Sequence, residues 1–285
     1  MVDMHTASVK ERIMQSAQLT ETEKKSSLAP YYNREITPPP DDVLSTLNEG
    51  PVDGNDALPF ARINDLLDPG YLKVENGYCV MPDGVHYTAI LTKMPKVTGE
   101  MINWWFWWMP QEDLRYKIWC PGDHCSHPPA DKDRLINSKL PMGERFWDNP
   151  MSVLEIIDDI PIEITITFVS PEEFGLDRDR FREAKVATAI CAFIGTSEIN
   201  KIAMLHFVRN TDQGVEMRSR FWAGEGIRVK ELQQGSHVNK TLNTPEARDE
   251  LIPPGIEKAL AFHCTKEYSH LATILPELYE KYGIM

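Results

Sequence analysis

Two residues near the C-terminus, His263 and Glu267, have the side-chain types and the spacing needed to hold a metal ion. They are four residues apart, so on an α-helix they lie on one face, one turn apart. Imidazole nitrogen and carboxylate oxygen are both common ligands of zinc. The pair could instead form a His–Glu hydrogen bond in a polar patch of the core, or face water, and the helix alone leaves these alternatives open.

The helix that carries this pair is predicted over residues 254–283, with Pro254 near its first turn and Gly283 at its end. Steps of three or four residues place the pair in an apolar stripe, whose aliphatic members are Ile256, Leu260, Leu271, Ile274 and Leu278. Burying a carboxylate without a partner is costly, so Glu267 is expected to be paired, protonated or bound to a metal. His270 lies just off the stripe and is a further candidate.

A second group of possible ligands follows a tryptophan-rich segment, INWWFWWMPQEDLRYKIWCPGDHCSH, at residues 102–127. The candidates are Cys120, His124, Cys125 and His127. The chain contains no C-x-x-C pair, which a closed structural zinc site would normally use. We interpret the aromatic run as a strand, after which Pro121-Gly122 turns the chain and presents His124. The tryptophans are expected either to pack in the core or to form the walls of a ligand pocket.

Composition excludes several classes of function. The formal net charge of −13 argues against binding to nucleic acid or to anionic membranes. No run of about 18 apolar residues is long enough to span a bilayer, and the N-terminus lacks the apolar core of a signal peptide. The five cysteines, an odd number, do not form the pattern of a disulfide framework. We therefore expect a reduced, cytoplasmic protein.

Several segments are predicted to form antiparallel strands. Residues 77–94 have the pattern of a hairpin around Pro-Asp-Gly, residues 160–170 alternate apolar and polar side chains, and residues 199–210 and 214–224 flank a turn. A polar helix is predicted over residues 7–26, and residues 1–60 are expected to pack on another subunit or to wrap the main domain. Strands closed by a long C-terminal helix predict an α+β helix-grip architecture, in which a curved sheet wraps the helix and leaves a cavity.

The runs NWWFWW and RYKIWCPGDH, with HCTKE in the final helix, resemble the 2,4-diacetylphloroglucinol hydrolase and phloretin hydrolase family. The resemblance covers roughly residues 60–283 and includes EMRSRFW at residues 216–222. It implies zinc-dependent cleavage of the carbon–carbon bond between a polyphenol ring and an acyl group. It also implies a Bet v 1-like helix-grip catalytic domain at residues 66–285, with an N-terminal extension at residues 1–65 that joins a homodimer.

The resemblance also implies roles for individual residues. The family's zinc ligands, one ion per chain, correspond to His124, Glu155, His263 and Glu267. The role of Glu155 comes from the family spacing alone, because Asp158 and Asp159 are equal candidates by residue type. The tyrosine that binds a phenolic oxygen in the family corresponds to Tyr116.

This chain departs from the family pattern at two places. His127 stands where the family has an asparagine, and a pocket tyrosine is replaced by Phe221 or Trp222. We therefore expect a remodelled pocket that favours a dihydrochalcone such as phloretin over small acetylated rings.

Delivery of a proton to the ring carbon needs a general acid, for which Tyr116, His127 and His206 are the candidates. The expected substrate-binding residues are Trp104, Trp105, Trp107, Tyr116, Phe221 and Trp222. His206 and His86, in predicted strands, could equally be core histidines. Two other functions remain open: a non-catalytic helix-grip protein that binds hydrophobic aromatic ligands, and a metal-dependent oxygenase.

Overall fold

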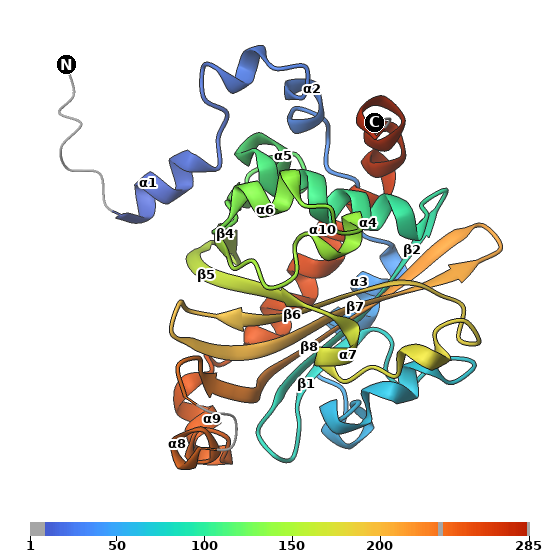
Figure 1. Cartoon of the computed structure of the whole chain (residues 1–285). Coiled ribbons are helices and arrows are strands. Elements are labelled where there is room, and N and C mark those ends of the chain that lie inside the picture. Colours follow the sequence, from blue (N-terminus) through green and yellow to red (C-terminus); the bar gives the residue numbers. More distant parts are fainter. Residues whose placement is uncertain (1–8, 233–235, 284–285) are drawn as a thin grey trace.

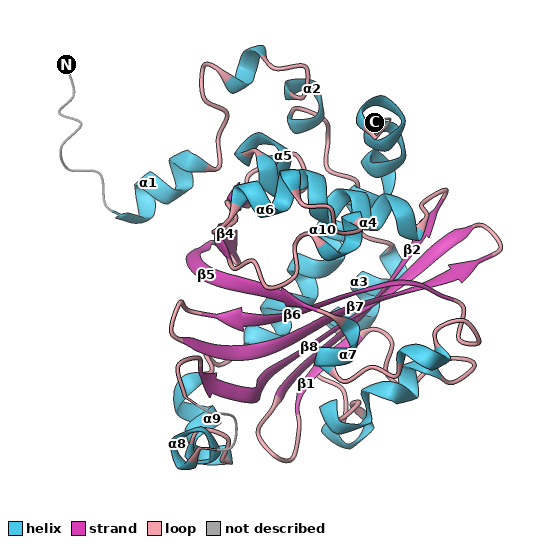
Figure 2. Cartoon of the chain, in the orientation of Figure 1, coloured by secondary structure: helices cyan, strands magenta, loops and turns pink. Residues whose placement is uncertain are grey.

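Within residues 9–232 and 236–283, which the computed structural model describes, eight antiparallel strands form one sheet in the order β1-β2-β8-β7-β6-β5-β4-β3. The sheet curves around the long helix α10 (Ile256–Tyr282), as Figures 1 and 2 show. The α+β helix-grip fold predicted from the sequence is therefore confirmed. The strands are β1 (Gly77–Val80), β2 (His86–Pro95), β3 (His124–Ser126), β4 (Met151–Ile157), β5 (Ile160–Val169), β6 (Val186–Gly195), β7 (Ile199–Thr211) and β8 (Gly214–Val229).

Apart from the aromatic run, the predicted strands and hairpins are present in the structure. β1 and β2 pair around the Pro-Asp-Gly turn, and β7 and β8 pair through a tight turn that ends at Gly214. A Cβ at Gly214 would lie 2.5 Å from the carbonyl oxygen of Met94, so a larger residue would force this turn away from β2. The alternating residues of β5 place Ile162, Ile164 and Ile166 toward α10, where they contact the core.

Helix α10 follows the apolar stripe expected from the sequence. It begins after Gly255, whose positive φ of 82° suits glycine, and it continues past Pro276 to Tyr282. The aliphatic residues Leu260, Leu271, Ile274 and Leu278 are buried against the sheet and the aromatic segment. His263 and Glu267 consequently point into the interior rather than into water.

The remaining helices connect or cover the sheet, and none of the helices in the described residues is long and apolar enough to cross a membrane. The α-helices are α1 (Val9–Ser16), α2 (Ala29–Tyr32), α3 (Asp41–Asn48), α4 (Gly99–Trp108), α5 (Asp113–Lys117), α6 (Lys132–Asn137), α7 (Pro171–Phe174), α8 (His237–Thr241) and α9 (Pro245–Leu251). The 3₁₀ helices are η1 (Glu23–Lys25), η2 (Gly54–Asp56), η3 (Phe60–Leu67), η4 (Met109–Gln111), η5 (Met142–Glu144) and η6 (Arg178–Arg180).

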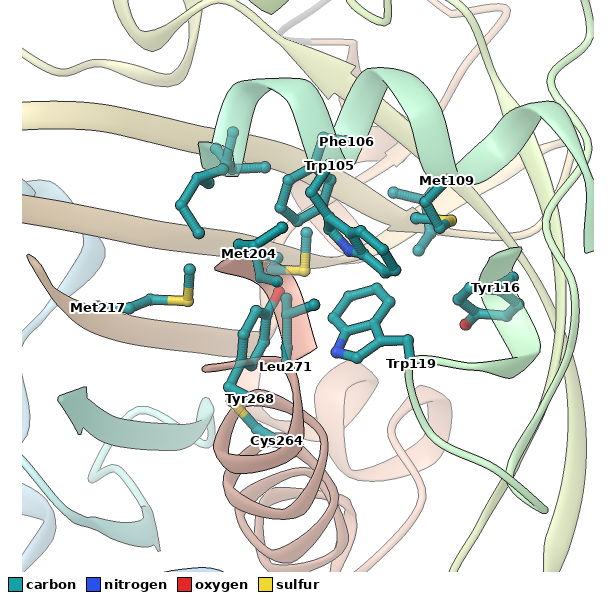
Figure 3. Packing of buried hydrophobic residues seen from close by; sticks show 14 of the residues in the cluster. Trp105, Phe106, Met109, Tyr116, Trp119, Met204, Met217, Cys264, Tyr268 and Leu271 are labelled. Atoms are coloured by element: carbon teal, nitrogen blue, oxygen red, sulfur yellow. The ribbon is translucent and has the colours of Figure 1, made fainter. Parts of the chain in front are cut away.

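The aromatic run forms helix α4 rather than a strand, so that prediction was wrong. Thr98 caps the helix by accepting a hydrogen bond from the Met101 backbone N–H at 3.2 Å. A Cβ on Gly99 would lie 2.7 Å from the Ala187 carbonyl oxygen, so this glycine lets the helix approach β6 closely. Figure 3 shows Trp105 and Phe106 extending from α4 on the side that faces α10. An apolar run buried on nearly all sides shows no helical period, which is why the sequence pattern was misread.

The N-terminal segment wraps the main domain. The predicted helix over residues 7–26 is shorter in the structure, because α1 ends at Ser16 and only the 3₁₀ turn η1 follows before residue 26; residues 7 and 8 lie outside the described residues. Leu28, Tyr31, Val43 and Leu47 are buried in the core that contains α10. This segment therefore contributes core of its own, which the sequence alone did not indicate.

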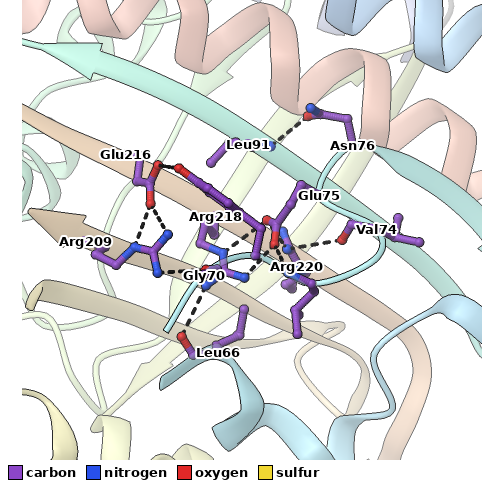
Figure 4. A network of polar contacts seen from close by, with 12 residues as sticks. Leu66, Gly70, Val74, Glu75, Asn76, Leu91, Arg209, Glu216, Arg218 and Arg220 are labelled. Carbon is purple, nitrogen blue, oxygen red and sulfur yellow. Dashed lines mark hydrogen bonds and ion pairs between the residues drawn. The ribbon is translucent and has the colours of Figure 1, made fainter. Parts of the chain in front are cut away.

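The convex face of the sheet is covered by residues 52–76 around a buried ionic network (Figure 4). Arg218 and Arg220 of β8 each donate to the carboxylate of Glu75, at 2.5 and 2.6 Å. Two buried guanidinium groups need such a partner, because a charge left unpaired in the interior is strongly destabilising. The network fixes β8, so that its alternate residues, among them Phe221, face α10 on the concave side.

Candidate active site

Four side chains from three elements converge on the concave side of the sheet. His124 begins β3 and pairs with Glu155 of β4, while His263 and Glu267 lie one turn apart on α10. The Nε2 atoms of the two histidines are 3.4 Å apart, and Glu267 Oε2 is 3.4 Å from His124 Nε2. Glu155 Oε2 lies 3.8 and 4.0 Å from the same two nitrogens. The structure thus brings together all four residues that the family resemblance indicated.

The orientation of both histidines suits a metal ion. The Nδ1 atom of His124 lies 3.3 Å from the Tyr116 carbonyl oxygen, and Nδ1 of His263 lies 3.5 Å from Asp123 Oδ2. Each ring therefore has an acceptor beside Nδ1, which favours a proton there and leaves the Nε2 lone pair facing the carboxylates. One ligand atom each from His124, His263 and Glu267 lies within 4.8 Å of the other two, and these three residues could hold a metal ion.

Without an ion, the cluster retains protons. Burial lowers the pKa of His263, but hydrogen bonding to Asp123 and the charges of Glu267 and Glu155 outweigh it and raise the pKa to about 9. Burial, together with Glu155, raises the pKa of Glu267 to about 8. Carboxylates that share a buried site resist ionisation, and a divalent cation would neutralise them in place of protons. The donor set therefore fits a metal.

Tyr116 links this cluster to the cavity. Its hydroxyl donates to Glu155 Oε2 at 2.6 Å, and its ring stacks on His124 with centroids 4.0 Å apart. Burial, with the neighbouring charge of Glu155, raises the pKa of Tyr116 well above its ordinary value. The phenol therefore stays protonated at neutral pH and can donate a hydrogen bond or a proton.

A cavity of about 360 Å³ opens from the cluster between α10 and strands β4–β8. Of the residues expected from the sequence, its wall contains Tyr116, His127, Glu155, His206, Phe221, His263 and Glu267. His124 is fully buried behind them. Most of the remaining lining is aliphatic or aromatic and comes from β5, β6, β7 and the first turns of α10. The cavity is therefore an apolar chamber with a polar end.

Four tryptophans that were expected in the pocket lie elsewhere, so those predictions were wrong. Trp104 stacks on Trp108, and Trp107 donates its indole N–H to the Leu135 carbonyl oxygen. Trp105 is buried behind Trp119, with the two rings edge to face. Trp222 lies on the convex face, where its indole N–H donates to the Leu58 carbonyl oxygen at 2.7 Å. Successive β8 residues face opposite sides, so Phe221 lines the cavity and Trp222 does not.

Other aromatic residues, which sequence reasoning missed as pocket residues, line the cavity instead. Phe106, Trp119 and Tyr268 are in its wall, and Trp119 also donates to the Glu267 carbonyl oxygen at 3.2 Å. The Tyr268 hydroxyl is buried and has no hydrogen-bond partner among the residues that the structure describes. Figure 3 shows Trp119 between Tyr116 and Tyr268. Tyr268 follows Glu267 directly on α10, but successive helical residues point about 100° apart, so its position in the sequence gave no signal of a place in the cavity wall.

The four other histidines that the sequence offered as candidates fall into two groups. His127 and His206 line the cavity, and burial lowers the pKa of His127 to about 4 and of His206 to about 3. His86 instead pairs with Glu257 at 2.7 Å and is absent from the cavity wall. His270 accepts a hydrogen bond from the Thr37 backbone N–H at 3.1 Å, which excludes it from the cluster. At neutral pH the two cavity histidines are therefore uncharged.

The buried His206 makes stability sensitive to acid. Its pKa is about 3 in the folded chain and about 6.5 in the unfolded chain, so below pH 6.5 only the unfolded chain binds this proton. The free energy of unfolding should therefore fall as pH falls from 6.5, with about 1.4 kcal/mol per pH unit due to His206. Urea unfolding of metal-free H206Q from pH 6 to 4 should show a slope smaller by that amount. An unchanged slope would show that His206 titrates normally in the fold.

Comparison with known proteins decides the family. Residues 58–280 match the family model described as the DAPG hydrolase PhiG domain. This chain belongs to the DAPG hydrolase family. The resemblance found in the sequence is thereby confirmed, and so is the expectation of an enzyme of the hydrolase class.

Two relatives named as hydrolases are similar to this chain over about nine tenths of its length. Phloretin hydrolase from Eubacterium ramulus is 33% identical over 268 residues, which cover 91% of this chain and 91% of that protein. The 2,4-diacetylphloroglucinol hydrolase of Pseudomonas protegens is 30% identical over 263 residues, which cover 90% of this chain and 84% of that protein. Among solved structures, Ara h 8.0201 is 11% identical with a TM-score of 0.32, covering 65% of this chain and 98% of that one.

Proposed function

We propose that this chain is a zinc-dependent hydrolase that cleaves the carbon–carbon bond between a phloroglucinol-type ring and its acyl group. The observation that carries the proposal is the convergence of His124, Glu155, His263 and Glu267 at the polar end of an apolar cavity. Membership of the DAPG hydrolase family, with relatives named for phloretin and 2,4-diacetylphloroglucinol, supports this choice of substrate class.

One zinc ion per chain is proposed to be held by these four residues. Neutral imidazole nitrogens and carboxylate oxygens are suitable ligands, and zinc held by four protein donors would take up water or a substrate oxygen by expanding to five-coordinate. When bound, zinc would polarise the aryl ketone and lower the pKa of a coordinated water toward about 7. The walls of the cavity are mainly apolar, so a bound aromatic substrate would displace water from them.

The overall reaction consumes one water molecule. The oxygen of water adds to the acyl carbon, the bond from that carbon to the ring breaks, and the electron pair of the bond passes to the ring. The ring accepts this pair as a keto tautomer, in which a ring hydroxyl has become a carbonyl and a proton has been added to the carbon that carries the acyl group. The pair passes to the oxygen of that carbonyl, which takes up a proton from water to restore the free polyphenol, and the acyl group leaves as a carboxylic acid.

Tyr116 is the proposed donor of the proton that is added to the ring carbon. Among the three candidates, His127 and His206 are neutral at pH 7 and are weak acids in that form. The Tyr116 hydroxyl is protonated and lies at the cavity end of the cluster, 2.6 Å from Glu155. Before transfer, the same hydroxyl would hydrogen-bond a phenolic oxygen of the substrate. His127 Nδ1 and the Tyr268 hydroxyl, both buried in the wall, are available for other substrate oxygens.

We also propose a cytoplasmic homodimer with a catalytic domain at residues 66–285 and an extension at residues 1–65. All five cysteines are free and buried, which agrees with a reducing compartment. Helix α1 packs at the edge of the sheet, where Ile13 contacts Cys125 and Ile156. Met14 on the same helix is exposed, which leaves an apolar side chain for a second subunit. Sedimentation of the full chain and of a chain lacking residues 1–20 would measure the contribution of this segment.

The function is tested by incubating the protein with acylated polyphenols in H₂¹⁸O, with and without a chelator. We expect release of the free phenol and of a carboxylic acid carrying one ¹⁸O, and loss of both products when the chelator removes the metal. Binding of the polyphenols without any product would instead favour a carrier of hydrophobic ligands. Turnover that requires oxygen would favour an oxygenase.

The cavity shape predicts a preference among substrates. Its lining includes both His263 and Ile256, which are seven residues or about 10 Å apart along α10, and it also includes Ile252, Gly195 and Thr196. This apolar extension suits the phenylpropanoyl arm of phloretin, whereas an acetyl group would leave it unfilled. We expect kcat/KM for phloretin to exceed that for monoacetylphloroglucinol by about tenfold or more, since burying even two extra carbons contributes about 1.6 kcal/mol. A higher kcat/KM for the acetylated ring would contradict this preference.

A further inference from the structure

Asp123 lies on the side of His263 that faces away from the four-residue cluster. Its Oδ2 atom is 3.5 Å from His263 Nδ1 and accepts a hydrogen bond from Lys266 Nζ at 2.7 Å. The Asp123 side chain is absent from the cavity wall, so it has no part in substrate binding or in proton transfer as proposed above. Its contact with a proposed ligand needs another explanation.

The backbone of Asp123 is tied to the other half of the cluster. Asp123 directly precedes His124, and its carbonyl oxygen accepts a hydrogen bond from the Ile156 N–H at 2.7 Å. Ile156 in turn follows Glu155 on β4. One residue therefore connects the start of β3, the strand β4 and the helix α10, which together carry all the proposed ligands.

We propose that Asp123 is a positioning residue, which holds His263 in the ring orientation and tautomer that present Nε2 to the metal. The inference rests on the proposed function, in which His263 is a ligand. An imidazole has two neutral tautomers, and an acceptor beside Nδ1 selects the one with a free Nε2 lone pair. The 3.4 Å separation of the two Nε2 atoms agrees with this orientation.

His124 shows why the carboxylate matters at His263. The acceptor beside His124 Nδ1 is the Tyr116 carbonyl oxygen, which is part of the backbone and stays in place whatever the side chain. His263 lies on a continuous helix, where it has no such loop carbonyl, and the Asp123 side chain serves instead. Lys266, three residues after His263 on the same helix, donates a hydrogen bond to the Asp123 oxygen that lies beside His263, Oδ2.

The test compares D123A, D123N and K266M with the unsubstituted protein. The dissociation constant for Zn²⁺ is measured by chelator competition, and the histidine tautomers of the zinc-loaded protein are read from ¹H–¹⁵N NMR correlations. We expect both Asp123 substitutions to weaken zinc binding by about 10- to 100-fold. One protected Nδ1–H signal, that of His263, should be lost in D123A while the His124 signal remains. K266M keeps the carboxylate and should retain the His263 signal and bind zinc more tightly than D123A.

Two results would overturn the inference: zinc affinities of both Asp123 variants within twofold of the unsubstituted protein, or a loss in K266M as large as that in D123A. The second result would mean that the ion pair, rather than the contact with His263, supports the site. D123N, which is nearly isosteric, guards against misfolding of D123A. Failure of the unsubstituted protein to bind zinc would contradict the proposed function itself, so the two failures are distinguishable.

Discussion

H263A and E267A are each expected to lower kcat/KM for an acylphenol by about 1,000-fold or more and to remove most of the bound zinc. Each substitution deletes one of the donors that converge within 4 Å of one another, and metal polarisation of the ketone is worth several kcal/mol of barrier. The measurements are steady-state kinetics on phloretin and metal content per chain after dialysis.

The structure offers a matched control for this prediction. Glu257 is a second buried glutamate on α10 that pairs with a histidine, His86 on β2, at 2.7 Å, but neither residue lines the cavity. E257A should therefore change stability while leaving the zinc content and the turnover of the folded protein close to their original values. Equal losses of activity in E257A and E267A would indicate that any damage to α10 inactivates the chain.

Stability of the metal-free protein separates a ligand from a structural residue. The pKa of Glu267 is raised to about 8 in the fold, above its ordinary value of 4.5, so the folded state favours the protonated form. Ionisation of this group above pH 4.5 therefore opposes folding until the metal compensates. Metal-free E267Q should have a Tm at pH 8 that equals or exceeds that of the metal-free unsubstituted protein. A large fall in Tm would contradict a role for Glu267 as a ligand held at a cost to stability.

Y116F is expected to lower kcat by about 100- to 10,000-fold while leaving the zinc content unchanged. A loss of this size in kcat is typical of the removal of a general acid. The zinc content should not change, because phenylalanine keeps the ring that stacks on the ligand His124. Removal of the hydroxyl also removes a hydrogen bond to Glu155, which has other neighbours in the cluster. Rapid-mixing kinetics with phloretin, with zinc measured on the same sample, would provide both values.

The other two candidates for the proton donor serve as comparisons. H127Q and H206Q should each reduce kcat by less than Y116F, because burial keeps both imidazoles neutral and neither contacts the cluster as Tyr116 does. A loss in H206Q larger than that in Y116F would transfer the role of general acid to His206. His206 would then have to bind a proton in the substrate complex, despite a pKa of about 3 in the free protein.

The features that the sequence predicted well depend on local periodicity. The stripe on α10 placed His263 and Glu267 among aliphatic residues at helical spacing, and the structure decides that this stripe faces the interior rather than water. The hairpins of β1–β2 and β7–β8 followed from turn residues between apolar runs. Both signals arise from residues close together in the chain, and both elements are present in the structure.

The features that residue patterns alone did not reveal depend on contacts between distant segments. Glu155 faces His124 only because β3 and β4 pair in one register, which residue types do not specify. The placement of Phe221 inside and Trp222 outside depends on a one-residue alternation, and the sequence offered no means to assign the face. Helix α4 was misread because its aromatic residues are buried on nearly all sides, so they lack the amphipathic pattern by which helices are recognised.

A titration of the metal-free protein with Zn²⁺, followed by the initial rate of phenol release, tests the central claim most directly. We predict that the rate rises linearly with added zinc and levels off at about one ion per chain, and that the same titration of H263A gives no comparable rise. Full activity in protein shown to contain no metal would contradict the account, since the buried carboxylates and imidazoles would then have some other purpose.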